Sequence, residues 1–368
     1  IQMNITKLQA DKIKDEILYY LKYDKFLNEI DKNSLLSIVE ELSSFKVWDY
    51  KPNLNNWPSI IKDYFISHTD HLGNVVSLEH HAFNNYEVKK YLRYFKEIEH
   101  LFISKLMEYD KPLYYLDVDN TLTDNAYLSP AKIDFISNWE NKKNIILNTG
   151  KVSASIMNVI DACNLHNNYY ACLNGSVIAK EGTFEIIDRL GSISESIIND
   201  LNKTNINYIT YYENQIHVIK ELNDENIYFL KKYNEWFIDK KKPTDYQRII
   251  KILTFIHENE PEKENIVRKI VMKHPHLISV RTAEHCFEIL NKDQHKGNSV
   301  KRIAEYMNKY YRCSVGVGDS MNDLRMLDYV GYPYVVSNVS LELKKYDFSI
   351  VEGSRDKDIV NILNKYSK

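Results

Sequence analysis

The length and composition of the chain are those of a globular protein with more than one domain. It has 368 residues, 44% hydrophobic and 27% charged, which predicts two or three domains at about 150 residues each and excludes wholesale disorder. The formal net charge of −3 argues against a nucleic-acid binder or a polybasic membrane module. No apolar run approaches the ~20 residues that cross a bilayer, and the N-terminus lacks a signal-peptide pattern. We therefore expect a cytoplasmic protein without nucleic-acid or membrane partners.

Residues 1–110 carry a helical pattern that no strand pattern interrupts. Apolar residues recur at helical spacing, for example over 8–21 and 35–42, so we interpret this region as a helical bundle or arm. It contains a group of histidines whose spacing matches no firm metal template, and a solvated loop is the default interpretation of them. These are His68, His71, His80 and His81.

From residue 111 the pattern alternates between strands and helices. The first predicted elements are strands at 113–118, 144–147 and 169–173, separated by helices at about 129–140 and 152–162. The pattern resumes with a helix at 297–309, a strand at 313–317, a helix at 323–329, a strand at 332–336 and a helix near 357–364. Such βαβ alternation predicts a parallel, doubly wound sheet.

The residues between these two stretches predict a separate α+β block. Its expected order is helix 194–202, strands 208–212 and 216–220, helix 225–239, strand 249–257, helix 262–272, and strands 277–281 and 286–290. We therefore predict three parts. They are an N-terminal helical region at 1–110, an α/β core at 111–179 and 293–368, and an inserted α+β domain at 180–292.

Polar residues follow the predicted core strands at the edge where such sheets bind ligands. They form two acid clusters, a hydroxyl beside a glycine, and a lysine that opens a helix. The residues are Asp117, Asp119, Asn120, Thr149, Gly150, Lys296, Asp319, Asn322 and Asp323.

These residue types suit phosphoryl transfer. Clustered carboxylates hold Mg²⁺, which offsets the repulsion between a carboxylate nucleophile and a phosphate dianion. One of Asp117 and Asp119 would attack phosphorus, and the other would handle the proton of the leaving oxygen. Thr149 and the N–H of Gly150 could bond phosphate oxygens, and Lys296 would supply positive charge.

The four clusters resemble the motifs of the haloacid dehalogenase superfamily of phosphotransferases, over residues 112–368. Asp117-Val118-Asp119-Asn120-Thr121 is similar to its first motif, Thr149-Gly150 to the second, Lys296 to the third, and Gly318-Asp319-Ser320-Met321-Asn322-Asp323 to the fourth. The insert resembles the type IIB cap of Cof-like sugar phosphatases and phosphomannomutases. Asn174-Gly175 resembles the turn that precedes that cap.

The resemblance implies a role for each motif residue. Asp117 would be the nucleophile and a Mg²⁺ ligand, and Asp119 the general acid/base whose carbonyl also binds the metal. Asp319 would be a second carboxylate ligand, and Asp323 would bind the metal directly or through water. A phosphate-gripping set is also implied: Thr149, Gly150, Lys296 and Asn322. Asn120 is a further candidate substrate-binding residue.

Two positions depart from the wider type IIB pattern. Asn120 stands where many members have Gly, so we expect the first loop to differ from theirs in backbone detail. Lys151 replaces a common Arg and cannot make a bidentate contact.

A narrower resemblance, resting on the helical region ahead of the first motif and on LDVDNTLTDN, is to the IMP-specific 5'-nucleotidases. It implies hydrolysis of IMP to inosine and phosphate, a homo-oligomer, and a nucleotide effector acting through the N-terminal helices. Two alternatives stay open. One is a sugar phosphatase or phosphosugar mutase with the same motifs, and the other is a partner-binding or regulatory protein built on the N-terminal helices.

Overall fold

The computed structural model describes residues 100, 103–104, 107, 111–233, 235, 237–239, 243, 245–283, 285–309, 311–346 and 348–367. The predicted helical region at 1–110, with its four histidines, lies almost wholly outside this part of the chain. The chain divides into two compact units. One holds residues 114–299, 317–326 and 334–368, and the other takes in 300–316 and 327–333 with the residues up to 113.

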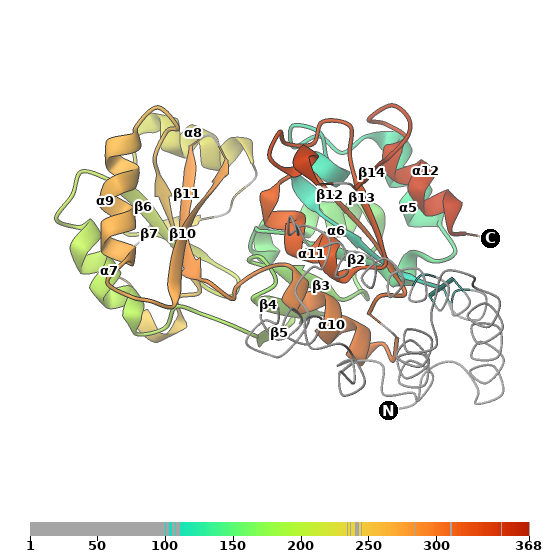
Figure 1. The fold of residues 1–368 in the computed structure, drawn as a ribbon, viewed down its shortest axis with the longest axis horizontal. Helices are drawn as coiled ribbons and strands as arrows, with labels where there is room; N and C mark the ends of the chain where they lie inside the picture. Colours follow the sequence, from blue (N-terminus) through green and yellow to red (C-terminus); the bar gives the residue numbers. More distant parts are fainter. Residues whose placement is uncertain are drawn as a thin grey trace, which may run out of the picture. The chain divides into compact units, whose positions relative to one another are not determined.

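The core is an eight-stranded sheet (Figure 1). Its order is β14 (Ser349–Ile350), β13 (Tyr332–Val335), β12 (Ser314–Gly318), β1 (Leu113–Leu116), β2 (Ile145–Asn148), β3 (Tyr170–Cys172), β4 (Val177–Lys180) and β5 (Thr183–Ile186). β1, β2 and β3 pair in parallel, whereas β4 and β5 continue the sheet antiparallel. Every side chain of β1 and β2 is buried, as expected of strands covered on both faces.

Helices and short helical turns connect the core strands. The helices are α5 (Pro130–Asn138), α6 (Met157–Cys163), α10 (Gly297–Tyr306), α11 (Leu324–Tyr329) and α12 (Asp358–Lys365). The start of α5 follows from its sequence. Ser129 is the N-cap and its side chain accepts a hydrogen bond from the N–H of Lys132, while Pro130 occupies the first helical turn, where no N–H is needed.

A second, six-stranded sheet is formed between β5 and α10. Its order is β10 (Leu277–Ala283), β11 (Cys286–Asn291), β9 (Lys251–Phe255), β6 (Asn207–Tyr211), β7 (Ile216–Val218) and β8 (Phe237–Asp239), antiparallel except for β7 and β8. Three helices accompany it: α7 (Ile193–Leu201), α8 (Asp224–Lys232) and α9 (Pro261–Val271).

One face of the six-stranded sheet packs against α7 and α9 (Figure 1). Ile197 of α7 and Val267 of α9 form a buried cluster with Ile252 and Phe287 of the sheet. Because successive side chains of a strand point to opposite faces, the neighbours Lys251 and Glu288 lie on the other face.

The predicted fold class, a parallel-sheet α/β core with an inserted α+β block, is confirmed, and several element predictions were wrong. The helix expected at 225–239 ends at Lys232, and Phe237–Asp239 is instead strand β8. The hairpin of β4 and β5 and the two-residue strand β14 were not predicted. Strands of two to four residues contain too few alternations for a period to be recognised, although the Glu181-Gly182 turn, with φ of 51° and 81°, is a hairpin signal.

The bounds of the other elements agree to within a few residues. The loop after β1 is a five-residue helical turn, Val118–Leu122, where the prediction extended the strand to 118. Among the described residues, no helix combines the length and hydropathy that spanning a bilayer requires.

We expect Ile252→Ala to lower the free energy of unfolding by about 2–5 kcal/mol, because it removes a fully buried side chain between the sheet and its helices. Chemical denaturation would measure this loss. Met272→Ala, at an 80% exposed position after α9, is the control and should change stability by no more than about 0.5 kcal/mol. Equal losses in the two variants would contradict the packing described here.

Candidate active site

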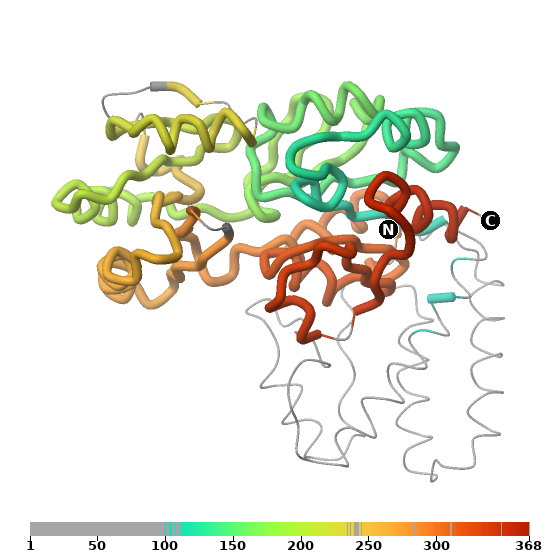
Figure 2. The backbone as a smooth tube through the Cα atoms, turned by 90° about the horizontal axis from the view of Figure 1, so that it is seen from above, coloured from blue at the N-terminus to red at the C-terminus, as the bar shows by residue number. Residues whose placement is uncertain are grey.

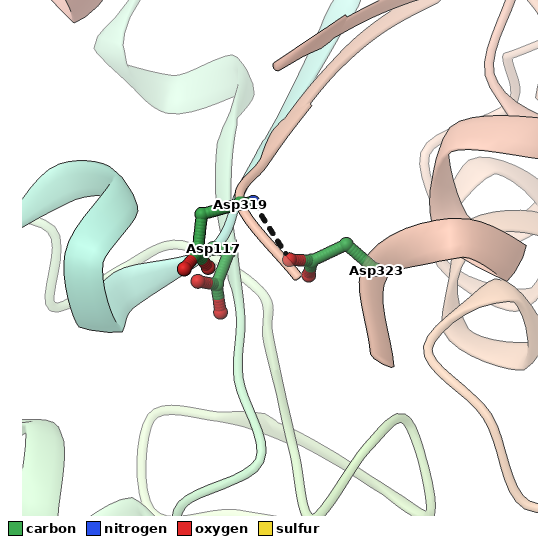
Figure 3. Close-up of side chains that lie close together, drawn as sticks. All are labelled: Asp117, Asp319 and Asp323. Atoms are coloured by element: carbon green, nitrogen blue, oxygen red, sulfur yellow. Dashed lines mark hydrogen bonds between the residues drawn. The ribbon is translucent and has the colours of Figure 1, made fainter. Parts of the chain in front are cut away.

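The two acid clusters meet at one end of the core sheet. The N–H of Asp117 donates to the carbonyl of Val317 at 3.0 Å, so β1 and β12 end side by side. Asp117 directly follows β1, and Asp319 directly follows β12. Asp323 closes a short helical turn that leads into α11. Figure 3 shows the carboxylates of Asp117 and Asp319 next to each other, with Asp323 facing them.

Lys296 is the buried cation of this cluster. Its Nζ donates to Asp117 Oδ1 at 2.6 Å and to Asp323 Oδ1 at 2.7 Å, and its side chain has no solvent exposure. The backbone is held as well, since the side-chain amide of Asn148, the last residue of β2, donates to the Lys296 carbonyl at 3.0 Å. Lys296 therefore links the ends of three chain segments that are far apart in sequence.

Asp323 is saturated with hydrogen-bond donors. Its Oδ2 accepts from the backbone N–H groups of Asp319 (2.9 Å) and Ser320 (3.1 Å), while Oδ1 accepts from Lys296. Only glycine fits at position 318, before the loop, because a Cβ at Gly318 would lie 2.5 Å from the Asp323 side chain. Asp323 thus orders the loop after β12, and its oxygens face protein donors.

Burial and mutual repulsion shift the ionisation of the cluster. Burial, and then the charge of Asp323, raise the pKa of Asp117 well above its ordinary value. The same two causes raise the pKa of Asp319 to about 7. Burial alone would lower the pKa of Lys296, but the charges of Asp117 and Asp323 outweigh it and raise the pKa. The lysine stays charged, and one positive charge faces three carboxyl groups.

The carboxyl cluster fits a hard divalent cation. Asp117, Asp319 and Asp323 each offer an oxygen, and these oxygens lie within 4.8 Å of one another. Carboxylate oxygens are the ligands that Mg²⁺ prefers. After burial, the negative charge of a neighbouring carboxylate is the next cause of the raised pKa of Asp117 and of Asp319, and a cation would neutralise that charge. Because both oxygens of Asp323 already accept hydrogen bonds, Asp117 and Asp319 are the better direct ligands.

Asp119 lies beside the carboxyl cluster on a different partner. Its Oδ1 is 3.0 Å from Lys151 Nζ. The Asp119 side chain is 28% exposed, more than those of Asp117 and Asp323, which contact Lys296. Lys151 also donates to the Tyr233 carbonyl, and its N–H donates to Thr149 Oγ1 at 3.2 Å. Lys151, which stands where the resemblance implies an arginine, therefore pairs with Asp119, the candidate general acid/base.

A buried ion pair of the six-stranded sheet contacts the loops after β2 and β3. Lys251 Nζ donates to Glu288 Oε1 at 2.6 Å and to the carbonyl of Gly150 at 3.0 Å. Glu288 Oε2 accepts from the side-chain amide of Asn174 at 3.2 Å. Gly175 follows with φ of 80°, and a Cβ there would lie 2.6 Å from the His295 carbonyl. The Asn174-Gly175 turn is thus packed against the backbone beside Lys296.

The structure brings together most of the predicted site residues, in contacts of different kinds. Asp117, Lys296 and Asp323 are in direct contact, and Thr121 Oγ1 donates to Asp319 at 3.4 Å. Other predicted residues are engaged elsewhere in the loops. Asn120 adopts a left-handed backbone with φ of 58°, Gly150 offers its carbonyl to Lys251, and Asn322 Oδ1 accepts from the Ser320 hydroxyl at 2.7 Å.

Sequence reasoning missed Lys251 and Glu288 as neighbours of the site. Both look like ordinary residues of alternating strands. The signal that could have found them is a charged side chain on each of two otherwise apolar strand faces, since buried charges are rare unless paired.

The chain has sequence relatives among phosphatases. The sequence profile of the haloacid dehalogenase-like hydrolases matches residues 114–362. A provisionally named phosphatase of Streptococcus pyogenes is 20% identical over 280 residues, 68% of this chain and 96% of that protein. Shorter matches span only 33% and 24% of two relatives. They are a provisionally named phosphatase of Haemophilus influenzae, 31% identical over 87 residues (23% of this chain), and a phosphatase of Bacillus subtilis, 35% identical over 68 residues (18%).

Solved structures share the fold. A haloacid dehalogenase-like hydrolase from Bacteroides thetaiotaomicron superposes with a TM-score of 0.60 at 16% identity, over 70% of this chain and 99% of that one. A subclass IIB sugar phosphatase superposes with a TM-score of 0.57 at 17% identity, over 70% and 98% of the two chains. The chain belongs to the haloacid dehalogenase-like hydrolases, and the family together with its named relatives supports a phosphatase.

Proposed function

We propose that this phosphatase is a Mg²⁺-dependent 5'-nucleotidase that hydrolyses a nucleoside monophosphate, IMP first among them, through an aspartyl-phosphate on Asp117. The observation that carries the chemistry is the buried Lys296, which holds Asp117 and Asp323 at 2.6 and 2.7 Å. A carboxylate fixed by a buried cation at the end of a parallel sheet is oriented for attack on phosphorus.

In the first half-reaction Asp117 attacks the phosphorus of the substrate. Since Lys296 holds Oδ1, we assign the attack to Oδ2, which forms the bond to phosphorus while the bond from phosphorus to the 5'-oxygen breaks. Asp119 gives its proton to the departing oxygen, and Lys151 fixes the Asp119 carboxyl from 3.0 Å. The products of this step are the nucleoside and the phosphorylated Asp117.

In the second half-reaction water replaces Asp117 on phosphorus. Asp119, now a carboxylate, takes a proton from the attacking water, and the bond between phosphorus and Oδ2 of Asp117 breaks to release phosphate. We assign phosphate binding to Thr149 and the N–H of Gly150, together with Lys296. Thr149 is supported by the N–H of Lys151 on its Oγ1 at 3.2 Å, which orients the hydroxyl.

Asp117 and Asp319, the carbonyl of Asp119 and, through water, Asp323 would hold Mg²⁺. When bound, the ion would offset the repulsion between the Asp117 carboxylate and the phosphate. The excess of carboxyl groups over lysine in the cluster supports this assignment.

The choice of IMP is the finer part of the proposal and rests on the resemblance in sequence. We propose that the α+β insert at 180–292 acts as a cap that excludes water and contacts the leaving group. The homo-oligomer and the nucleotide effector acting through residues 1–110 belong to the same proposal. Fold likeness to a subclass IIB sugar phosphatase makes a phosphosugar the alternative substrate.

A substrate panel tests the proposal. We expect phosphate release from IMP to exceed that from other nucleoside monophosphates and from hexose phosphates by at least about tenfold in kcat/KM, a difference of about 1.4 kcal/mol. Release from hexose phosphates alone would overturn the nucleotidase proposal in favour of the sugar phosphatase. Transfer of phosphate between hydroxyls of one sugar would indicate a mutase. Folded protein without phosphatase activity would favour a binding role.

Asp117→Asn should lower kcat by at least about a thousandfold, because an amide is not a nucleophile for this step. Asp161→Asn is the matched control, since that carboxylate lies on α6 with its side chain 61% exposed. Acid-quench labelling with ³²P substrate should detect a phosphoprotein in the wild type and in the control. Labelling that persists in Asp117→Asn would place the nucleophile elsewhere.

Mg²⁺ should raise the stability of the protein as well as its activity, because the ion neutralises carboxylates that repel each other only in the folded state. Mg²⁺ at about 100 times its Kd should add about 2.7 kcal/mol to the free energy of unfolding. Thermal unfolding in EDTA and in Mg²⁺ measures this difference. It should shrink in Asp319→Asn, and an equal gain in that variant would rule out the assigned ligands.

A further inference from the structure

The helical turn Val118–Leu122 carries Asp119 and is held from its carboxyl-terminal side. Within the turn, the N–H of Leu122 bonds the Asp117 carbonyl at 3.2 Å and the N–H of Thr123 bonds the Val118 carbonyl at 2.9 Å. The carbonyls of residues 120 to 123 instead accept hydrogen bonds from side chains of other chain segments. These donors satisfy backbone acceptors that the turn itself does not.

Arg355 supplies three of these contacts. Its Nη2 lies 2.7 Å from the carbonyl of Asn120, 3.2 Å from that of Thr121 and 3.0 Å from that of Thr123. The fourth carbonyl, of Leu122, accepts from Lys132 Nζ of α5 at 3.0 Å. Arg355 and Asn120 are 235 residues apart in sequence, and the red segment before α12 passes beside the blue-green turn (Figures 1 and 2).

One buried carboxylate anchors both cations. Asp358, the first residue of α12, has Oδ1 3.0 Å from Lys132 Nζ and accepts from Arg355 Nη1 through Oδ2. The side chains of Lys132 and Asp358 are 2% and 1% exposed, and that of Arg355 is 18% exposed. Arg355 and Lys132 thus share one carboxylate while their nitrogens donate to the carbonyls of the turn, and charged donors make the stronger hydrogen bonds.

The backbone of this turn contains one left-handed residue, and Arg355 contacts it. Asn120 has φ of 58°, in the left-handed region that costs energy for a residue with a Cβ. Its carbonyl receives the shortest of the three Arg355 contacts. Because Asn120 directly follows Asp119, a change of its backbone dihedrals would move the Asp119 carboxyl away from the substrate.

We propose that Arg355, with Lys132 and Asp358, is a positioning residue for Asp119. The three side chains hold the turn in the conformation from which Asp119 gives its proton to the leaving oxygen. This inference rests on the proposed acid role of Asp119. It assigns a supporting role to Arg355 and Asp358 of the C-terminal segment, which act on Asp119 through the backbone of the turn and not through the substrate or the carboxyl cluster.

The test uses the dependence of the rate on the leaving group. A p-nitrophenolate leaves with little protonation, whereas an alkoxide needs the acid. Arg355→Met should lower kcat/KM on an alkyl phosphate such as glycerol phosphate by about ten- to a hundredfold. It should lower kcat/KM on p-nitrophenyl phosphate by no more than about threefold, because kcat/KM covers the steps up to departure of the leaving group and not the later water step, in which Asp119 acts as base for both substrates. Lys132→Met, which releases the same turn from α5, should show the same selectivity if Arg355→Met does not fold.

Arg281→Met is the matched control. Arg281 also joins a carboxylate, Glu264, to a backbone carbonyl, that of Ile256, with a side chain 25% exposed, but it lies in the six-stranded sheet. It should leave the ratio of the two rates unchanged. Arg355→Lys keeps the charge but presents one nitrogen, so part of the selective loss should be restored.

The outcomes separate the two proposals. Asp119→Asn must itself lose far more kcat/KM on the alkyl phosphate than on p-nitrophenyl phosphate, and if it does not, the acid role fails and the inference falls with it. If Asp119→Asn is selective but folded Arg355→Met and Lys132→Met lose kcat/KM equally on both substrates, the acid role stands and positioning by Arg355 is overturned. Unchanged kcat/KM in both folded variants would overturn it too.

Discussion

The site depends on one buried lysine in a cluster of carboxyl groups. Moving a carboxylate out of water costs several kcal/mol, and this cost is offset only where a cation and hydrogen-bond donors replace the water. Lys296 meets that condition for Asp117 and Asp323 at once, and two backbone N–H groups complete Asp323. The compensation is incomplete, because one lysine faces three carboxyl groups. Asp319 lies close by, and its pKa is raised. The excess negative charge of the cluster favours the binding of a cation at this site.

The loops around Lys296 are fixed by contacts that leave little freedom to the backbone. The Asn148 side chain holds the Lys296 carbonyl from the end of β2. Gly318 leaves the space that the Asp323 side chain fills, and Gly175 lets its turn approach His295. Substitution at either glycine would displace backbone that carries a site residue, so the geometry of the carboxyl cluster and the local chain path are set together.

Cations that bond carbonyls recur in the loops of this sheet edge. Lys251 binds the Gly150 carbonyl, Lys132 binds that of Leu122, and Arg355 binds three carbonyls of the turn after β1. Each cation is in turn paired with a buried acid, Glu288 or Asp358. Loops at strand ends lack the ladder of hydrogen bonds that fixes strands, and these pairs supply a substitute from distant parts of the chain.

The sequence by itself determined the fold class, the family and the residues at the core strand ends. Apolar runs alternating with helical stretches define a parallel sheet, and the acids that follow the runs at Asp117 and Asp319 must then share one edge. It did not determine β8, the β4–β5 hairpin or the partners of the site. Those of Asp119 and of its turn are Lys151, Arg355 and Lys132. The resemblance singles out the position of Lys151 but not its partner, and nothing local to Arg355 and Lys132 distinguishes them from surface charges. Their role arises from burial and from contacts across up to 235 residues, which only tertiary packing decides.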